Sequence, residues 1–389
     1  MNDFSTLSIK PVRFSPSVEV PKSDEAETQT ELVDTLLGMS KTMADHTGHA
    51  MRAVHAKSHG LLRGELRVVE GLPTELAQGL FAAPLTYPVV LRISTPPAEA
   101  LDDRVSLPRG MAIKVIGVEG ERVAGSEGDS IQDFLFVDGP VFAAPDAKGF
   151  LKNLKLLAGT TDKAPTAKRM LSSVLQGVEK AIEAVGGQSS TLISMGGHAE
   201  THPLGATFFT QVPIRYGAYI AKLQLAPVSP DLRALEDAPI DLDGKPDGTR
   251  EAVADFLRSH TGEPAEWELR VQLCTDLEKM PIEDASVEWP QDLSPFIAVA
   301  RLTLHAQDGW SDALSREIDD GMAFNPWHAL AAHQPLGGVM RARRVAYAAS
   351  SQFRGERTGC PMHEPRMPST PDTPDAPGYT SPSISSSAS

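Results

Sequence analysis

Cysteine is nearly missing from this chain, which has only Cys274 and Cys360 among its 389 residues. The two lie far apart and in unlike surroundings. The sequence therefore indicates neither a disulfide framework nor a cysteine metal site. Any redox chemistry must come from a bound group.

Long apolar runs and excess positive charge are missing as well. No run approaches the roughly 20 apolar residues that a membrane helix needs, and the start of the chain lacks the apolar stretch of a signal peptide. Lys and Arg number 36 against 51 Asp and Glu, a formal net charge of −15. We therefore expect a cytoplasmic protein whose main partners are neither nucleic acid nor anionic membranes.

The chain divides into three parts. Residues 1–24 are rich in Pro, Ser and Lys, which predicts an extended N-terminal arm. Residues 357–389 are dominated by Pro and Ser and have few apolar side chains, so we predict a disordered tail that cannot bury enough surface to order itself. Residues 25–356 carry the apolar patterns, and we expect them to form one large domain.

Short alternating or apolar runs separated by Gly and Pro indicate strands in this domain. The expected strands are 62–69, 89–94, 112–118, 134–137, 205–212, 218–226, 267–275 and 297–305. Helical patterns cover 25–52, 147–185 with a break, 310–320, and a last region that begins near 337. The arrangement predicts an α+β fold, an antiparallel β-barrel with surrounding helices.

The last helical region carries a stripe of polar residues. Arg343, Tyr347, Ser350 and Arg354 follow each other at i, i+4, i+7 and i+11, so they share one helix face. An arginine one turn before a tyrosine favours the phenolate over the phenol, and a phenolate is an anionic metal ligand. The alternative is an exposed tyrosine on a basic helix.

Two upstream segments add candidate residues. His55 has apolar flanks and follows Arg52 by three residues, a setting in which a neutral imidazole can act as acid and base, although a lone histidine is more often structural. Strand alternation sends Arg92 and Ser94 to the same face. An inward arginine requires a carboxylate, either in an ordinary buried salt bridge or in an anionic ligand shared with Arg52 and Arg354.

Several dispersed segments together resemble the haem catalases and catalase-related peroxidases. The similar segments are, in order, 54–57 (VHAK), 92–95 (RIST), 108–114 (PRGMAIK), 140–147 (PVFAAPDA), 287–290 (VEWP), 297–304 (IAVARLTL), 324–326 (FNP) and 343–347 (RRVAY) with Arg354 beyond it. Their order and spacing both agree with that superfamily, over residues 50–355. The resemblance implies a catalase-like haem-binding barrel.

The resemblance also implies a role for each candidate residue. Tyr347 would ligate the iron of haem b as a phenolate, supported by Arg343. His55 would move a proton from one peroxide oxygen to the other. Ser94 would hold the imidazole in one tautomer.

The three remaining arginines would bind the other end of the cofactor. Arg52, Arg92 and Arg354 would hold the two haem propionates, because guanidinium forks pair well with carboxylates.

One departure from the family concerns the segment before 140. Catalases carry G-N-N-T-P there, with an asparagine amide over the iron, whereas residues 136–140 read FVDGP. Asp138 is the nearest polar candidate for a catalytic group, but an ionised carboxylate only accepts hydrogen bonds, and a shift of one residue would put Val137 there instead. The resemblance thus implies a peroxidase that reduces hydrogen peroxide or organic hydroperoxides with small organic electron donors, with weak or no catalase activity.

Two other functions stay open. The same residues would serve an enzyme that rearranges or cleaves fatty-acid hydroperoxides, and a barrel of this size could also bind haem without turnover. The chain is shorter than a catalase, which implies that segments tying the catalase tetramer together are reduced. We therefore expect a homo-oligomer that is either a dimer or a tetramer.

Overall fold

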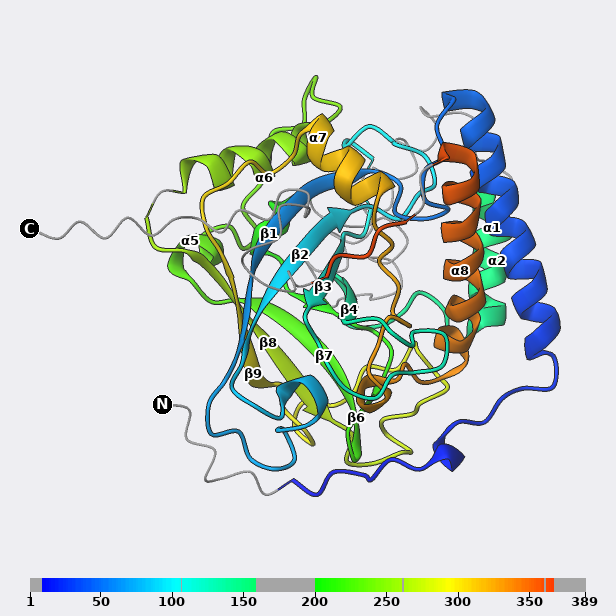
Figure 1. Ribbon diagram of the computed structural model, residues 1–389, viewed down its shortest axis with the longest axis vertical. Helices are drawn as coiled ribbons and strands as arrows, with labels where there is room; N and C mark the ends of the chain where they lie inside the picture. Colours follow the sequence, from blue (N-terminus) through cyan, green and yellow to red (C-terminus); the bar gives the residue numbers. More distant parts are fainter. Residues whose placement is uncertain (1–8, 106, 159–199, 261, 360–361, 367–389) are drawn as a thin grey trace, which may run out of the picture.

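A closed antiparallel barrel forms the centre of the protein (Figure 1). The computed structural model describes residues 9–105, 107–158, 200–260, 262–359 and 362–366. Hydrogen-bonded neighbours follow the order β5-β4-β3-β2-β1-β9-β8-β7, and a pairing between β5 and β7 closes the ring, which confirms the predicted α+β barrel. The strands are β1 Ser58–Val68, β2 Thr86–Ser94, β3 Gly110–Ile116, β4 Ile131–Val137, β5 Phe208–Phe209, β7 Tyr219–Pro227, β8 Ala265–Leu273 and β9 Ile297–Leu304, with β6 Ile214–Tyr216 paired to β7 outside the ring.

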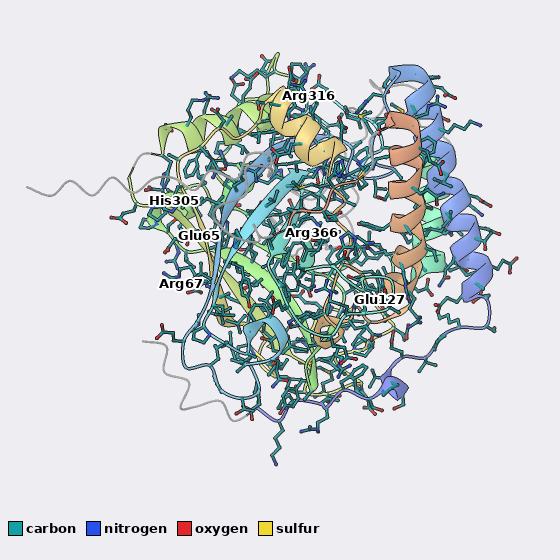
Figure 2. All side chains as sticks on the ribbon, in the orientation of Figure 1. Glu65, Arg67, Glu127, His305, Arg316 and Arg366 are labelled. Atoms are coloured by element: carbon teal, nitrogen blue, oxygen red, sulfur yellow. The ribbon has the colours of Figure 1, made fainter. Side chains whose placement is uncertain are left out.

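Alternation along the strands separates the barrel interior from its outer face. On β1, Leu66 and Val68 are buried in the main apolar core, whereas Glu65 and Arg67 are exposed on the outside (Figure 2). Successive side chains of a strand point to opposite faces, so an apolar residue at every second position fills the barrel. The expected strands correspond to β1–β5 and β7–β9, and the short β6 was not expected.

Three helices lie side by side against one side of the barrel (Figure 1). They are α1 Glu25–Thr47, α2 Ala147–Ala158 and α8 Gly338–Thr358, and they share a second apolar core that includes Leu32, Leu36, Leu151, Leu154 and Ala346. The helical region predicted for 147–185 extends beyond α2. Its part from residue 159 onward lies outside the described residues, which resume at 200. None of the described helices has the length and apolar character that crossing a bilayer requires.

Shorter helices cover other parts of the barrel. They are α5 Pro230–Arg233, α6 Gly248–Ser259 and α7 Asp312–Leu314, a π-helical turn at Ser315–Asp320, and 3₁₀ turns at Pro16–Val18, Gly79–Phe81, Pro203–Gly205 and Ala331–His333. The sequence prediction assigned no element to 248–259. Thr249, Val253 and Leu257, spaced by four residues, form the buried face of α6 and would have indicated it.

Both ends of the described chain are held to the barrel. In the N-terminal arm, Val12 N donates to Cys274 O at 2.7 Å and Phe14 N to Ala218 O at 2.9 Å. Helix α8 ends at Thr358, so it includes the first two residues of the predicted tail. Beyond it, Glu364 forms a 2.7 Å ion pair with the fully buried Lys114. Most of the predicted tail, residues 360–361 and 367–389, lies outside the described residues.

Arg341, in the first turn of α8, fixes the helix that carries the polar stripe. Its guanidinium pairs with Glu19 of the arm at 2.7 Å, with Glu25 of α1 at 2.8 Å and with Glu283 at 3.0 Å. All four side chains are mostly buried. Arg341 thus ties the start of α8 to the N-terminal arm, to α1 and to the segment that contains Glu283.

We expect Arg341→Leu to lower the free energy of unfolding by about 2–4 kcal/mol, because three partly buried carboxylates would then face each other without a cation. Urea denaturation at pH 7 measures this loss. Arg357→Leu is the control, because its pair with Asp45 also joins α8 to α1 but is exposed. Equal losses in the two variants would contradict this role of Arg341.

Candidate functional site

A cavity of about 590 Å³ is enclosed by strands β2–β4 and by helices α1, α2 and α8. Seven of the eight predicted site residues line it: Arg52, His55, Arg92, Ser94, Arg343, Tyr347 and Arg354. Ser350, the remaining member of the polar stripe, also lines the cavity and accepts a bond from Ala53 N at 3.4 Å. The stripe of α8 therefore faces an internal space and is not an exposed basic surface.

His55 is fixed by contacts on two neighbouring strands. Its Nδ1 lies 3.0 Å from Ser94 Oγ on β2. In the register of β2 and β3, Ser94 lies opposite Gly110. A Cβ atom on Gly110 would lie 2.6 Å from His55 Cε1 and 2.8 Å from Nδ1, so only glycine leaves room for the ring. The role of Gly110 depends on cross-strand register, which the sequence alone did not reveal.

Burial, followed by the charges of Arg92, Arg343 and Arg52, lowers the pKa of His55 to about 3. The imidazole is therefore neutral at pH 7 and can accept a proton at whichever nitrogen is not protonated. Its backbone φ of 55° lies in the left-handed region, which a residue other than glycine rarely adopts. The surrounding contacts thus hold His55 in a strained position at the cavity wall.

Tyr347 and Arg343 form the pair that their spacing predicts. Arg343 Nη2 donates to Tyr347 Oη at 2.8 Å, and the guanidinium carbon lies 5.1 Å from the centre of the ring. The phenolic oxygen is thus held beside a guanidinium at the cavity. Tyr347 is thus the candidate ligand for a metal in the cavity. The described residues contain no group of three His, Cys, Asp or Glu side chains arranged to hold a metal ion.

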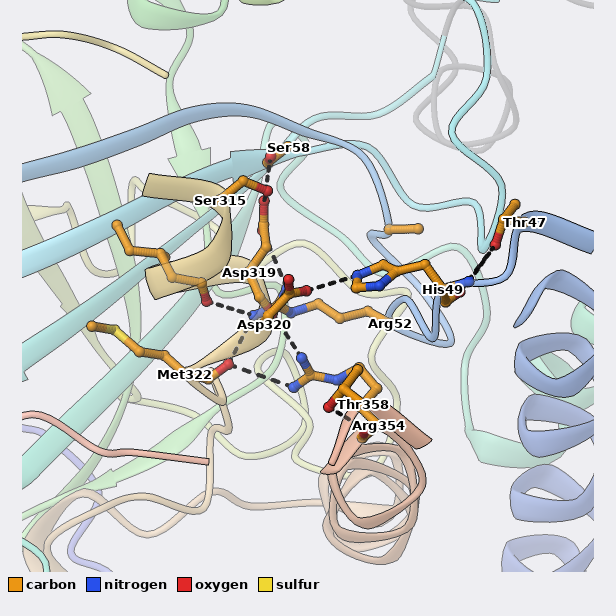
Figure 3. A network of polar contacts seen from close by, with 12 residues as sticks. Thr47, His49, Arg52, Ser58, Ser315, Asp319, Asp320, Met322, Arg354 and Thr358 are labelled. Atoms are coloured by element: carbon orange, nitrogen blue, oxygen red, sulfur yellow. Dashed lines mark hydrogen bonds and ion pairs between the residues drawn. The ribbon is translucent and has the colours of Figure 1, made fainter. Parts of the chain in front are cut away.

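Arg52, Arg92 and Arg354 converge on one turn of the chain, the π-helical turn at Ser315–Asp320. Figure 3 shows Arg52 and Arg354 at this turn. Arg92 Nε donates to the carboxylate of Asp319 at 2.6 Å, and Arg52 Nη1 does so at 3.2 Å. Arg354 Nη1 donates to the backbone oxygen of Asp319 at 2.8 Å. The predicted buried salt bridge of Arg92 is therefore present, and it is shared with a second arginine.

Asp319 is the carboxylate in contact with this arginine cluster, and the charges of Asp320 and Glu364 also act on Arg354. Although burial raises the pKa of Asp319, the charges of Arg92 and Arg52 lower it to about 2, so it is ionised at pH 7. Burial, followed by the charge of Arg92, lowers the pKa of Arg354 to about 10. Arg354 Nε is buried and has no hydrogen-bond partner among the described residues. This nitrogen is therefore a candidate donor for an anionic group in this part of the cavity.

Asp319 was not among the predicted site residues. The sequence indicated that an inward Arg92 needs a carboxylate, but it did not say which one. Asp319 lies 227 residues further along the chain. Ser58 Oγ and Ser315 Oγ also donate to its carboxylate, at 2.7 Å and 3.0 Å. Only the fold brings these segments together.

Asp138 is the one predicted site residue that is not among those lining the cavity. Its carboxylate accepts a bond from Arg109 N at 2.8 Å, and its own N donates to Arg109 O at 3.0 Å. The neighbouring Val137 and Gly139 do line the cavity. Of the two alternatives for this position, the cavity wall carries Val137.

His328 also lines the cavity, although the sequence offered no reason to select it. Its Nδ1 lies 3.0 Å from Asp133 Oδ2, and the same carboxylate pairs with Lys114 at 2.8 Å. Histidines in loop-like segments are usually surface residues, and nothing near His328 in sequence signals these distant partners.

Comparison with known proteins adds the class of fold. No family model matches the chain, and no curated protein matches it either. A closed antiparallel barrel with helices around it and a cavity between the two is a catalase-like fold. Among solved structures, the chain is similar to catalase A from Saccharomyces cerevisiae, with 17% identity and a TM-score of 0.56 over 82% of this chain and 63% of that chain.

A fungal catalase gives nearly the same values, with 18% identity, a TM-score of 0.55, and coverage of 82% of this chain and 61% of that chain. The chain thus spans just over three fifths of the length of these catalases. At such low identity the similarity establishes the fold, and the predicted catalase-like barrel is confirmed.

We expect Gly110→Ala to displace His55, because the new methyl group would overlap its ring. The free energy of unfolding should fall by about 1–3 kcal/mol. Urea denaturation and the NMR signals of the His55 ring measure the two effects. Gly139→Ala is the matched control, since a Cβ there meets only Gln211 Nε2, at 3.8 Å. A Gly110→Ala variant as stable as the control, with unchanged His55 signals, would contradict the close packing.

The low pKa of His55 predicts a pH-dependent stability. Between about pH 6.5 and pH 3 the unfolded chain carries a proton on His55 and the folded chain does not, so stability falls as the pH falls. In haem-free protein, His55→Gln should therefore show a shallower loss of stability over this window, by at most about 1.4 kcal/mol per pH unit. Denaturation from pH 7 to pH 4 checks this, with the exposed His305→Gln as the control. Identical slopes for wild type and His55→Gln would disprove it.

Proposed function

We propose that this chain is a haem-dependent peroxidase that reduces hydrogen peroxide or organic hydroperoxides with small organic electron donors. The observation that carries the proposal is the combination, around one cavity, of the Arg343–Tyr347 pair and a neutral His55 held by Ser94. The catalase-like fold supports it, because it is the fold of the two catalases that this chain resembles.

The residues of the cavity fit a haem group. The volume of about 590 Å³ falls within the roughly 300–1,000 Å³ that is usual for pockets that bind small organic molecules. Tyr347 would hold the iron as a phenolate, and Arg343 would stabilise its negative charge. Arg52, Arg92 and Arg354 would bind the propionates, and the partnerless Nε of Arg354 is a donor suited to such a carboxylate.

Haem, when bound, supplies the iron that peroxide oxidises. The protein's own contribution is the movement of one proton. Because His55 is neutral, it can take the proton from the near oxygen of an incoming peroxide and return it to the oxygen that leaves as water or alcohol. Ser94 keeps the ring in place during this transfer.

The wall around Val137 favours peroxidase turnover over catalase turnover. A catalase must bind a second peroxide as reductant, and the valine side chain cannot donate a hydrogen bond to it. Asp138 is proposed to contribute through its bonds to the backbone of Arg109. An organic electron donor, and not a second peroxide, would then reduce the oxidised enzyme.

The apolar end of the cavity keeps a second function open. Leu32, Leu36, Phe142, Phe150 and Leu154 line it, so the hydrocarbon part of a fatty-acid hydroperoxide would also find a suitable surface. Such an enzyme would rearrange or cleave that substrate without an added reductant. Product analysis with and without a phenolic dye separates the two reactions.

Tyr347→Phe is the test of the haem ligand. Wild-type protein supplied with haem should show a high-spin ferric absorption spectrum that changes on addition of one equivalent of peroxide. The phenylalanine variant should lose or alter the spectrum, because it lacks the anionic ligand. Tyr219→Phe, outside the cavity, should behave as wild type. Wild-type protein that takes up no haem, or an unchanged Tyr347→Phe spectrum, would rule out the assignment. His55→Ala, tested alongside, should keep the spectrum and lose the response to peroxide.

A further inference from the structure

Gln211, in the loop between β5 and β6, has an unusual backbone conformation. Its φ of 61° lies in the left-handed region, and Val212 N donates to Thr210 O at 2.7 Å across it. Residue 211 is therefore the centre of a γ-turn with positive φ, a rare and strained form. Strain of this kind persists where the surrounding structure enforces it, and it clusters at ligand-binding sites.

The side chain of Gln211 is anchored to the segment that follows β4. Its Nε2 donates to Gly139 O at 3.1 Å and to Val141 O at 2.5 Å. An amide nitrogen has two hydrogens, so both donors of this side chain are used. Gln211 thus holds the cavity wall that contains Val137, Gly139 and Phe142.

The amide oxygen of Gln211, Oε1, is available to accept a hydrogen bond. Gln211 is only 8% exposed, and its Oε1 has no hydrogen-bond partner among the residues that the structure describes. The residue borders the cavity of 590 Å³ and a second one of about 10 Å³. A cavity must be roughly 10–15 Å³ to hold one water, so only the large cavity has room for an organic partner. Because Oε1 is not fully buried, a ligand with a donor can reach it.

We propose that Oε1 of Gln211 is the hydrogen-bond acceptor for the O–H group of apolar alcohols and hydroperoxides bound in the large cavity. The neighbouring Val137, Phe136 and Phe142 offer only apolar surface, so Gln211 fixes the orientation of the polar end of the ligand. An acceptor binds a protonated hydroperoxide and repels a peroxide anion. For hydroperoxides this inference rests on the proposed function, whereas for alcohols it stands by itself.

The inference can be tested with two fluorinated probes, of which one has an O–H donor and the other lacks it. 4-Fluorobenzyl alcohol carries the O–H group and 4-fluorobenzyl methyl ether lacks it. Fluorine NMR titrations of the haem-free and haem-loaded protein give the two dissociation constants. Relative to wild type, Gln211→Met should reduce the preference for the alcohol over the ether by roughly 3- to 10-fold, the effect of losing one hydrogen bond. Binding of the ether should change little, which shows that the cavity is intact.

Gln272→Met is the matched control. Gln272 is also a buried glutamine whose Nε2 donates to two backbone oxygens, those of Trp289 at 3.1 Å and Ser294 at 2.8 Å. It does not border the large cavity. This variant loses the same kind of bonds, and its preference for the alcohol should stay at the wild-type value.

If Gln211→Met does not fold, Gln211→Gly takes its place, since glycine adopts positive φ without strain. An unchanged preference in the Gln211 variant, the same drop in Gln272→Met, or no binding of either probe to wild-type protein would overturn the inference. Failure of the proposed peroxidase would be seen separately, as protein that takes up no haem or does not respond to peroxide. The measurement on haem-free protein would still decide the role of Gln211.

Discussion

The burial of three arginines around a single carboxylate is the constraint on which the rest of the site depends. Removing a guanidinium from water is costly unless an anion or several carbonyl oxygens surround it. The turn at Ser315–Asp320 supplies both, through the carboxylate of Asp319 and the backbone oxygens of residues 318 and 319, and Met322 just beyond the turn adds a third oxygen. It thereby ties the start of β1, strand β2 and helix α8 to one point.

Electrostatics and packing act together on His55. Burial, followed by the charges of Arg92, Arg343 and Arg52, keeps His55 neutral. The ring keeps its place because β3 has a glycine where any side chain would collide with it. The cavity thus combines a region that attracts anions with a base that remains uncharged. Buried positive charge contributes to both properties, and for His55 its effect adds to that of burial.

The sequence revealed those parts of the site that depend on local spacing or on segments similar to a known family. Arg343 and Tyr347 are one helical turn apart, so their contact follows once the helix is assigned. His55 and Ser94 were selected from the resemblance to catalases, and the structure brings them within hydrogen-bonding distance. Strand positions were predicted well because alternation is a local pattern, although α6 was overlooked.

The remaining parts depend on which distant segments meet. Asp319 is one of many carboxylates in an acidic chain, and nothing near it in sequence distinguishes it. Gly110 matters only because of its register with Ser94, and Gln211 only because a turn brings its amide to the carbonyls of Gly139 and Val141.

The shortness of β5 has a consequence for how the barrel moves. This strand contributes one residue pair to β4 and two to β7, whereas the pairing of β1 with β2 involves nine. Few backbone hydrogen bonds therefore close the ring at this seam, and local opening needs the least free energy where such bonds are fewest. Because Gln211 follows directly after β5, the seam borders the cavity. Local opening of the barrel is therefore expected first at β5, beside the cavity, while the long strands stay paired.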